Sequence, residues 1–177
     1  MGVKVRTQHG NQMITRLNSL IVSVAFLATR QPSPAADQER QAEVSARGAQ
    51  VMPFQLSATT HVFTKTATGG VQQVVAKDLN DTKQIGLIRQ HLSDIADRFA
   101  GGDFSGPTET HGAQMPGLAQ LKGAKPGELR VLYTEIPAGG QIEYFAKSDQ
   151  MISAIHEWFD AQVSDHGHDA VEGHQHH

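Results

Sequence analysis

Cysteine is absent from this 177-residue chain. Its absence excludes disulfides, thiolate metal sites and cysteine nucleophiles. Histidine, methionine and carboxylates are therefore the side chains left to bind a transition metal. No apolar run approaches the roughly 20 residues that cross a bilayer, so we expect no membrane span after processing. The length fits one domain with a sizeable core.

Acidic residues are also absent from the first 36 positions. A basic stretch with Arg16 precedes an apolar run at 20–28 and a small-x-small sequence at 33–35, which is the order of a secretory signal. We therefore expect residues 1–35 to be a signal peptide, with Met13 as an alternative start, and the protein to be periplasmic or secreted in a bacterium. A short surface helix at a cytosolic N-terminus is the alternative interpretation.

The charge of the remaining chain narrows the choice of partners. Eleven bases and eighteen acids follow position 35, which gives a formal charge of −7. A nucleic-acid groove needs clustered Lys and Arg. We therefore expect no nucleic-acid partner.

The first structural signals follow a polar interval at 36–58, which its composition predicts to be a flexible spacer. β-Branched and aromatic residues at 60–66 and 71–77 flank Gly69-Gly70 and predict a hairpin. Asp81 then precedes apolar residues at helical spacing up to Phe99, and two glycines follow. The pattern predicts a capped amphipathic helix.

The same order returns about 70 residues later. Strands are expected at 128–136 and 141–146, and Ser148 precedes a helix that runs to Val163. This spacing suggests an internal duplication, although two glycine hairpins could also match by chance. The predicted fold is α+β, with two ββα halves that form a largely antiparallel four-stranded sheet and helices packed on one face.

The predicted domain therefore spans 59–166. Its halves are 59–102 and 128–166, and a Gly- and Pro-rich loop at 103–127 connects them. Loops of this length are often functional. Residues 167–177 form a His-rich tail.

A candidate metal site begins in the connecting loop, where His111 and Met115 lie close together. An imidazole with a thioether suits copper, especially Cu(I), better than a hard cation. The alternative is that Met115 fills the core. His156 and His166 are ten residues apart on one predicted helix, and they could share a site with His61 of the first strand. Packing of His156 beside its aromatic neighbours is the competing interpretation.

The tail alternates imidazoles with carboxylates, a composition expected of a metal-capturing tract. A solvated end without a metal-binding role is the alternative. The full set of candidate metal ligands is His61, His111, Met115, His156, His166, His168, His174, His176 and His177. Copper is the expected ion, with zinc or nickel as alternatives.

Sequence motifs for catalysis are missing. No Gly-x-Ser-x-Gly, phosphate-binding Gly-rich loop or His-Glu-x-x-His occurs. Asp165 could orient the adjacent His166 as a base, but no nucleophile accompanies this pair. We name no catalytic residue.

Several short segments spread over the predicted domain carry a resemblance to a known family. They are Thr60-His61-Val62-Phe63, Gly69-Gly70-Val71-Gln72, Gly102-Asp103-Phe104, His111-Gly112, Met115-Pro116-Gly117, His156-Glu157-Trp158-Phe159 and Asp165-His166-Gly167. Through them the domain resembles a family of small exported proteobacterial proteins that are often labelled aspartate carbamoyltransferase. The chain has no Ser-Thr-Arg-Thr type phosphate motif and half the length that this activity needs, so the residues do not support that label.

Three functions follow from these observations. The first is a periplasmic copper-binding protein that uses the domain histidines, Met115 and the tail. The second is a small periplasmic enzyme or ligand-binding module with a pocket between the sheet and the loop at 103–127, where His111 and His156 supply polar groups. The third is an interaction domain whose paired halves form a homodimer.

Overall fold

The computed structural model describes residues 1–4 and 34–174 of the chain. The chain divides into a unit of residues 1–31 and a unit of residues 32–177. All helices and strands of the described part belong to the second unit. Most of the expected signal peptide, with Met13, lies outside the described residues.

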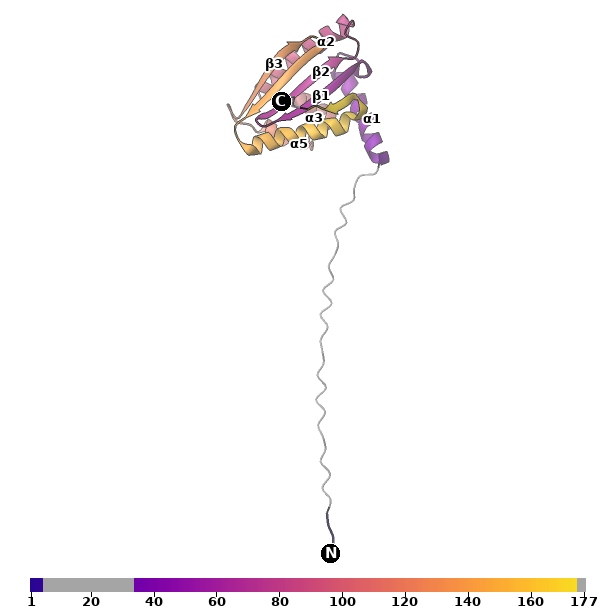
Figure 1. Ribbon diagram of the computed structural model, residues 1–177, viewed down its shortest axis with the longest axis vertical. Helices are drawn as coiled ribbons and strands as arrows, with labels where there is room; N and C mark the ends of the chain where they lie inside the picture. Colours follow the sequence, from indigo (N-terminus) through magenta and orange to yellow (C-terminus); the bar gives the residue numbers. More distant parts are fainter. Residues whose placement is uncertain (5–33, 175–177) are drawn as a thin grey trace. The chain divides into compact units, whose positions relative to one another are not determined.

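A mixed five-stranded sheet forms the centre of the second unit, in the order β3-β4-β2-β1-β5. Neighbours pair antiparallel, except that β5 runs parallel to β1. Figure 1 shows the strands side by side with α5 running along them. The strands are β1 (Thr59–Thr66), β2 (Gly69–Ala76), β3 (Leu129–Ile136), β4 (Gly139–Ala146) and β5 (Ala170–Glu172).

The prediction of an α+β fold is confirmed, whereas the prediction of four antiparallel strands is wrong by one strand. The additional strand β5 lies within the segment that we expected to be a tail. A three-residue strand is too short to show an alternating pattern in the sequence. Its pairing with β1 is visible only once the fold brings the two segments together.

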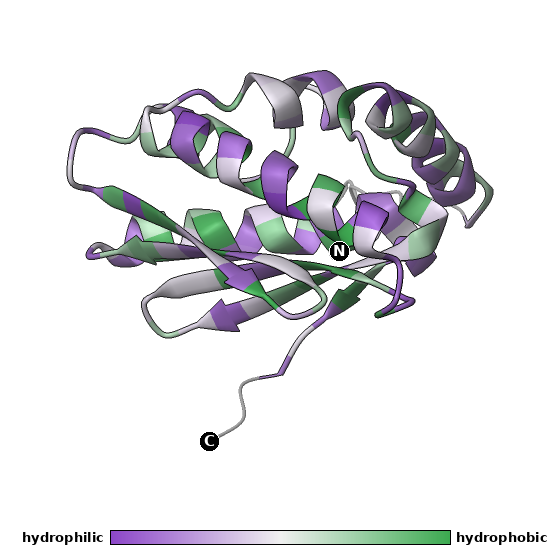
Figure 2. Cartoon of the chain, turned by 90° about the horizontal axis from the view of Figure 1, so that it is seen from above, coloured by the Kyte–Doolittle hydropathy of each residue, from purple (hydrophilic) through white to green (hydrophobic). Residues whose placement is uncertain are grey.

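Helices α2 and α5 pack on one face of this sheet, and Figure 2 shows the helical layer above the strands. Residues of β1, β2 and β4 that face these helices are buried in alternation, as a half-covered sheet requires. The helical segments are α1 (Pro34–Val51), η1 (Leu56–Ala58), α2 (Thr82–Ala100), α3 (Ser105–His111), α4 (Leu118–Lys122), α5 (Asp149–His166) and η2 (Gly167–Asp169). Within the described residues, no helix combines the length and hydropathy needed to cross a membrane.

The starts of α2 and α5 follow from their caps. The Asp81 carboxylate accepts a hydrogen bond from the Gln84 backbone N–H, and the Ser148 hydroxyl accepts one from the Met151 N–H. Each bond satisfies a donor that the first helical turn would otherwise leave free. The apolar stripe of α2 is buried from Ile85 to Phe99.

The two hairpins lie in equivalent positions, 70 residues apart. Gln72 of β2 lies directly opposite Ile142 of β4, which is the residue 70 positions later. The Ala76 N–H donates to Ala138 O at 2.9 Å, and the equivalent Ala146 N–H donates to Thr68 O at 2.9 Å. A local two-fold axis therefore relates the hairpins near Gln72 and Ile142.

The interval 36–58, for which a flexible spacer is expected, instead holds α1 and η1. Val44 and Gly48 of α1 are buried, and Phe54 belongs to the core. Arg47 Nε donates to the Thr110 backbone oxygen at 2.8 Å. The polar composition concealed this helix because several of its contacts with the domain are made by polar side chains.

Candidate functional site

A cavity of about 70 Å³ lies between the helix-covered face of the sheet and the surrounding helices. Its lining comes from α1 and the segment after it, β1, β2, α2, α3 and α5. Most of the lining is apolar. The lining residues are Val51, Met52, Phe54, His61, Phe63, Gln72, Val74, His91, Leu92, Ile95, Phe99, Gly106, Pro107, Thr110, His111, Trp158, Gln162 and His166.

Strand register supplies the floor of the cavity. His61 lies opposite Val74, and Phe63 lies opposite Gln72. Alternation along a strand places His61 and Phe63 on the same face, toward the helices. The Tyr144 hydroxyl donates to Gln72 Oε1 at 2.8 Å, so the amide group of Gln72 keeps its N–H donors for another partner.

Helix α5 supplies one wall through Trp158, Gln162 and His166. Residues four positions apart lie on one face of a helix, so these three side chains form a polar stripe within a mainly apolar surface. All three residues are buried. Trp158 is the single tryptophan of the chain.

Two buried nitrogen atoms in the lining have no hydrogen-bond partner within the part of the chain that the structure describes. They are His61 Nδ1 and Trp158 Nε1. His61 is 3% exposed and Trp158 is 1% exposed. Leaving a buried polar atom without a partner costs about 1–3 kcal/mol, so such atoms often mark a place where a ligand binds.

Three imidazoles from different elements meet beside the cavity. The rings of His61 and His166 stack with centroids 4.8 Å apart, and those of His111 and His166 meet nearly at right angles at 5.1 Å. Burial lowers the pKa of His61 to about 4, outweighing the opposing effect of the Asp169 carbonyl. Burial, with the neighbouring imidazoles, also lowers the pKa of His166 well below its ordinary value. Both rings are therefore neutral near pH 7.

Asp165 and Arg40 hold the third imidazole in place. Asp165 Oδ2 lies 2.8 Å from His111 Nδ1. Arg40 donates to both oxygens of Asp165, from Nε at 3.0 Å and from Nη2 at 2.7 Å, and Nη2 also donates to the His111 carbonyl at 2.6 Å. This arrangement fixes the orientation of the His111 ring at the cavity wall.

The ionisation of Asp165 determines which His111 nitrogen carries a proton. Burial raises the pKa of Asp165, but the hydrogen bonds from His111 and Arg40 outweigh it and bring the pKa to about 2. The carboxylate is thus charged near pH 7 and acts only as an acceptor. His111 Nδ1 must then donate to this carboxylate.

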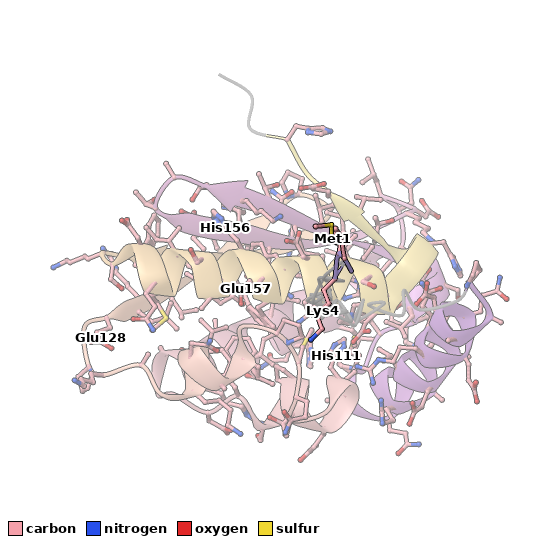
Figure 3. The ribbon with its side chains drawn as sticks, turned by 90° about the horizontal axis from the view of Figure 1, so that it is seen from below. Met1, Lys4, His111, Glu128, His156 and Glu157 are labelled. Atoms are coloured by element: carbon pink, nitrogen blue, oxygen red, sulfur yellow. The ribbon has the colours of Figure 1, made fainter. Side chains whose placement is uncertain are left out.

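Met115 is a buried core residue, and it lines a second pocket together with His111, Arg40 and Asp165. The other predicted histidines lie elsewhere. The His168 side chain is 91% exposed. His156 Nε2 lies 3.0 Å from Thr66 O and 2.9 Å from Gly69 O, where it closes the turn between β1 and β2. Figure 3 shows His111 and His156 on different sides of α5.

The structure therefore brings together His61, His111 and His166 from the predicted set. His174 is exposed near the described end of the chain, and His176 and His177 lie outside the described residues. Within residues 1–4 and 34–174, no group of three or more His, Asp or Glu side chains has a geometry suited to a metal ion.

Several site residues were missed at the sequence level. Trp158 and Gln162 have a detectable signal, because a side chain with a polar group recurs every four residues up to His166 on a helix whose other buried residues, apart from Asp165, are apolar. Asp165 was considered as a partner of His166, but it bonds to His111 instead. Arg40 lies 125 positions from Asp165, so sequence spacing gives no sign of their contact.

Searches against protein-family models, characterised proteins and solved structures found no match. The fold and the site thus define an α+β protein with a histidine-lined internal cavity. The resemblance described from the sequence segments remains an expectation.

Proposed function

We propose that this protein binds a small, largely apolar molecule in the cavity between the sheet and the helices. The observation that carries the proposal is a cavity whose mainly apolar lining contains two buried nitrogen atoms without partners among the described residues, His61 Nδ1 and Trp158 Nε1. Small-molecule sites commonly combine an apolar lining with a few polar groups that orient the ligand.

The size of the cavity supports the same function. Protein interiors are close-packed and contain few voids larger than one water molecule. A volume of about 70 Å³ has room for about two waters at roughly 30 Å³ each, or for a small ligand. An empty cavity of this volume costs about 2 kcal/mol of stability. Binding gives a reason for the protein to keep this space.

Trp158 provides a direct test because it is the only tryptophan and lines the cavity. The full chain would be titrated with benzene and cyclopentanone, and both the tryptophan fluorescence and the melting temperature would be measured. We expect a saturable fluorescence change and a raised melting temperature, since a ligand that binds only the folded state stabilises it.

A matched pair of variants separates the cavity from other surfaces. Val74→Phe adds a ring to the cavity floor, whereas Val171→Phe makes the same change at an exposed position of β5. We expect Val74→Phe to abolish probe binding and Val171→Phe to retain it. Equal binding by both variants, or no binding by the unaltered chain, would contradict the proposal.

A second candidate function is transition-metal binding, favoured by the convergence of His61, His111 and His166. Neutral imidazoles bind copper, zinc and nickel, and the tail histidines could capture ions for them. A metal ion would require His61 and His166 to leave their stacked arrangement, so that their nitrogens point to one centre.

Metal titration by calorimetry tests this second function. The full chain would be compared with a variant in which the three cavity histidines are Ala and with one in which the tail histidines are Ala. A one-to-one Cu(I), Zn(II) or Ni(II) complex that only the first variant loses would support a site in the domain. Loss only with the tail variant would confine metal binding to the tail.

The proposed setting is the bacterial periplasm, as the signal-like segment at 1–35 indicates. An internal duplication of a ββα unit is the proposed origin of the two equivalent hairpins. Expression with a C-terminal reporter and cell fractionation would test the location. Recovery of the full-length chain in the cytosol would contradict it.

A further inference from the structure

We infer that the ligand of this cavity is an uncharged molecule that presents a hydrogen-bond acceptor, such as a carbonyl oxygen, to the Trp158 indole N–H. The inference rests on the proposed binding in the cavity and adds the chemical class of the ligand.

The absence of charge follows from the lining. None of the eighteen lining residues is Lys, Arg, Asp or Glu. Asp165 and Arg40, which contact the lining residue His111, already bind each other through two hydrogen bonds. An ion buried without a counter-charge is strongly disfavoured, so an anion or a cation would bind poorly in this cavity.

The need for an acceptor follows from the donors. The indole N–H of Trp158 can only donate, and it has no partner among the described residues. Gln72 faces the same cavity with its oxygen already engaged by Tyr144, so its amide N–H groups are donors as well. A hydrocarbon would leave the Trp158 donor unsatisfied, whereas a carbonyl oxygen could accept from it.

Cyclopentanone and methylenecyclopentane are a suitable probe pair, because they share one shape and differ in an oxygen against a CH₂ group. A ¹⁵N-labelled full chain gives one indole N–H signal, since it has one tryptophan. We expect cyclopentanone to shift this proton signal downfield as the cavity fills, as hydrogen bonding does. Methylenecyclopentane should bind without such a shift.

The Trp158→Phe variant removes the donor and keeps an aromatic ring. Water solvates the ketone better than the alkene, so the informative quantity is the ratio of their two dissociation constants. We expect the dissociation constant of the ketone, divided by that of the alkene, to be roughly fivefold to tenfold larger in Trp158→Phe than in the unaltered chain, as the loss of one hydrogen bond predicts.

The outcomes separate the two proposals. If both probes bind and neither the indole signal nor the ratio changes as expected, the acceptor inference fails and cavity binding stands. If neither probe binds, both proposals fail. Should Trp158→Phe not fold, the indole shift in the unaltered chain decides, and a ketone complex without a downfield shift would overturn the inference.

Discussion

The buried imidazole of His61 gives a strong prediction about stability and pH. His61 is 3% exposed, and burial lowers its pKa to about 4 from the 6.5 of an exposed histidine. Between these two pH values the unfolded chain binds a proton that the folded chain does not. Stability is therefore complete above pH 6.5 and falls as the pH decreases toward 4.

The magnitude follows from the same two pKa values. One pH unit corresponds to about 1.4 kcal/mol, so His61 alone should remove about 3 kcal/mol of unfolding free energy between pH 6.5 and 4. His166 acts in the same direction, because burial lowers its pKa as well. Urea denaturation, followed by Trp158 fluorescence at several pH values from 7.5 to 4.5, measures this loss.

Substituting the histidine identifies the group responsible. His61→Gln removes the titrating ring. Between pH 6.5 and 4 this variant should therefore lose about 3 kcal/mol less unfolding free energy than the unaltered chain. His168→Gln is the matched control, because the His168 side chain is 91% exposed. An unchanged pH dependence in His61→Gln would refute the argument, as would a flat profile for the unaltered chain.

Three further predictions concern the surroundings of the cavity. Asp165→Asn should lower the unfolding free energy by about 2 kcal/mol at pH 7, measured by urea denaturation. The unaltered chain should lose this stability as the pH falls from about 4 to 2, and the variant should not. Gly117→Ala should destabilise the protein by about 3 kcal/mol, because the φ of Gly117 is +73° and a Cβ there would clash with the Ala154 carbonyl. Gly86→Ala, at an open position of α2, is its control and should stabilise the protein by about 1 kcal/mol, both measured by urea denaturation. His156→Ala should lower the melting temperature through loss of its hydrogen bond at the β1–β2 turn without changing probe affinity.

The hairpins and the two long helices could be predicted from the sequence because their signals are local. Asp81 and Ser148 cap their helices as expected, and a pair of glycines begins the second strand of each hairpin, directly after the turn. Helix α1 and strand β5 could not be predicted in this way. Helix α1 is held by hydrogen bonds from its side chains to residues more than 60 positions away in the sequence. Strand β5 is held by backbone pairing with the distant strand β1.

The candidate site shows the same division. Residue type alone indicated His61, His111 and His166, because imidazoles are common metal ligands. A pocket between the sheet and the loop at 103–127 was expected as one alternative, and Gly106, Pro107, Thr110 and His111 of that loop do line the cavity. The rest of the lining could not be predicted, since it comes from segments between Val51 and His166 that meet only in the folded chain. Residue type also indicated His156, whose role as a turn contact depends on the position of the β1–β2 hairpin.

The equivalence of the two hairpins has a consequence for how this protein can evolve. His61, Gln72 and Val74 line the cavity, whereas the positions 70 residues later are Val131, Ile142 and Tyr144, which pack in the core. Under the proposed binding function, selection for a new ligand would act on the first hairpin, while the core residues of the second hairpin would keep the fold stable. Ligand preference would then change faster in this protein than the fold itself.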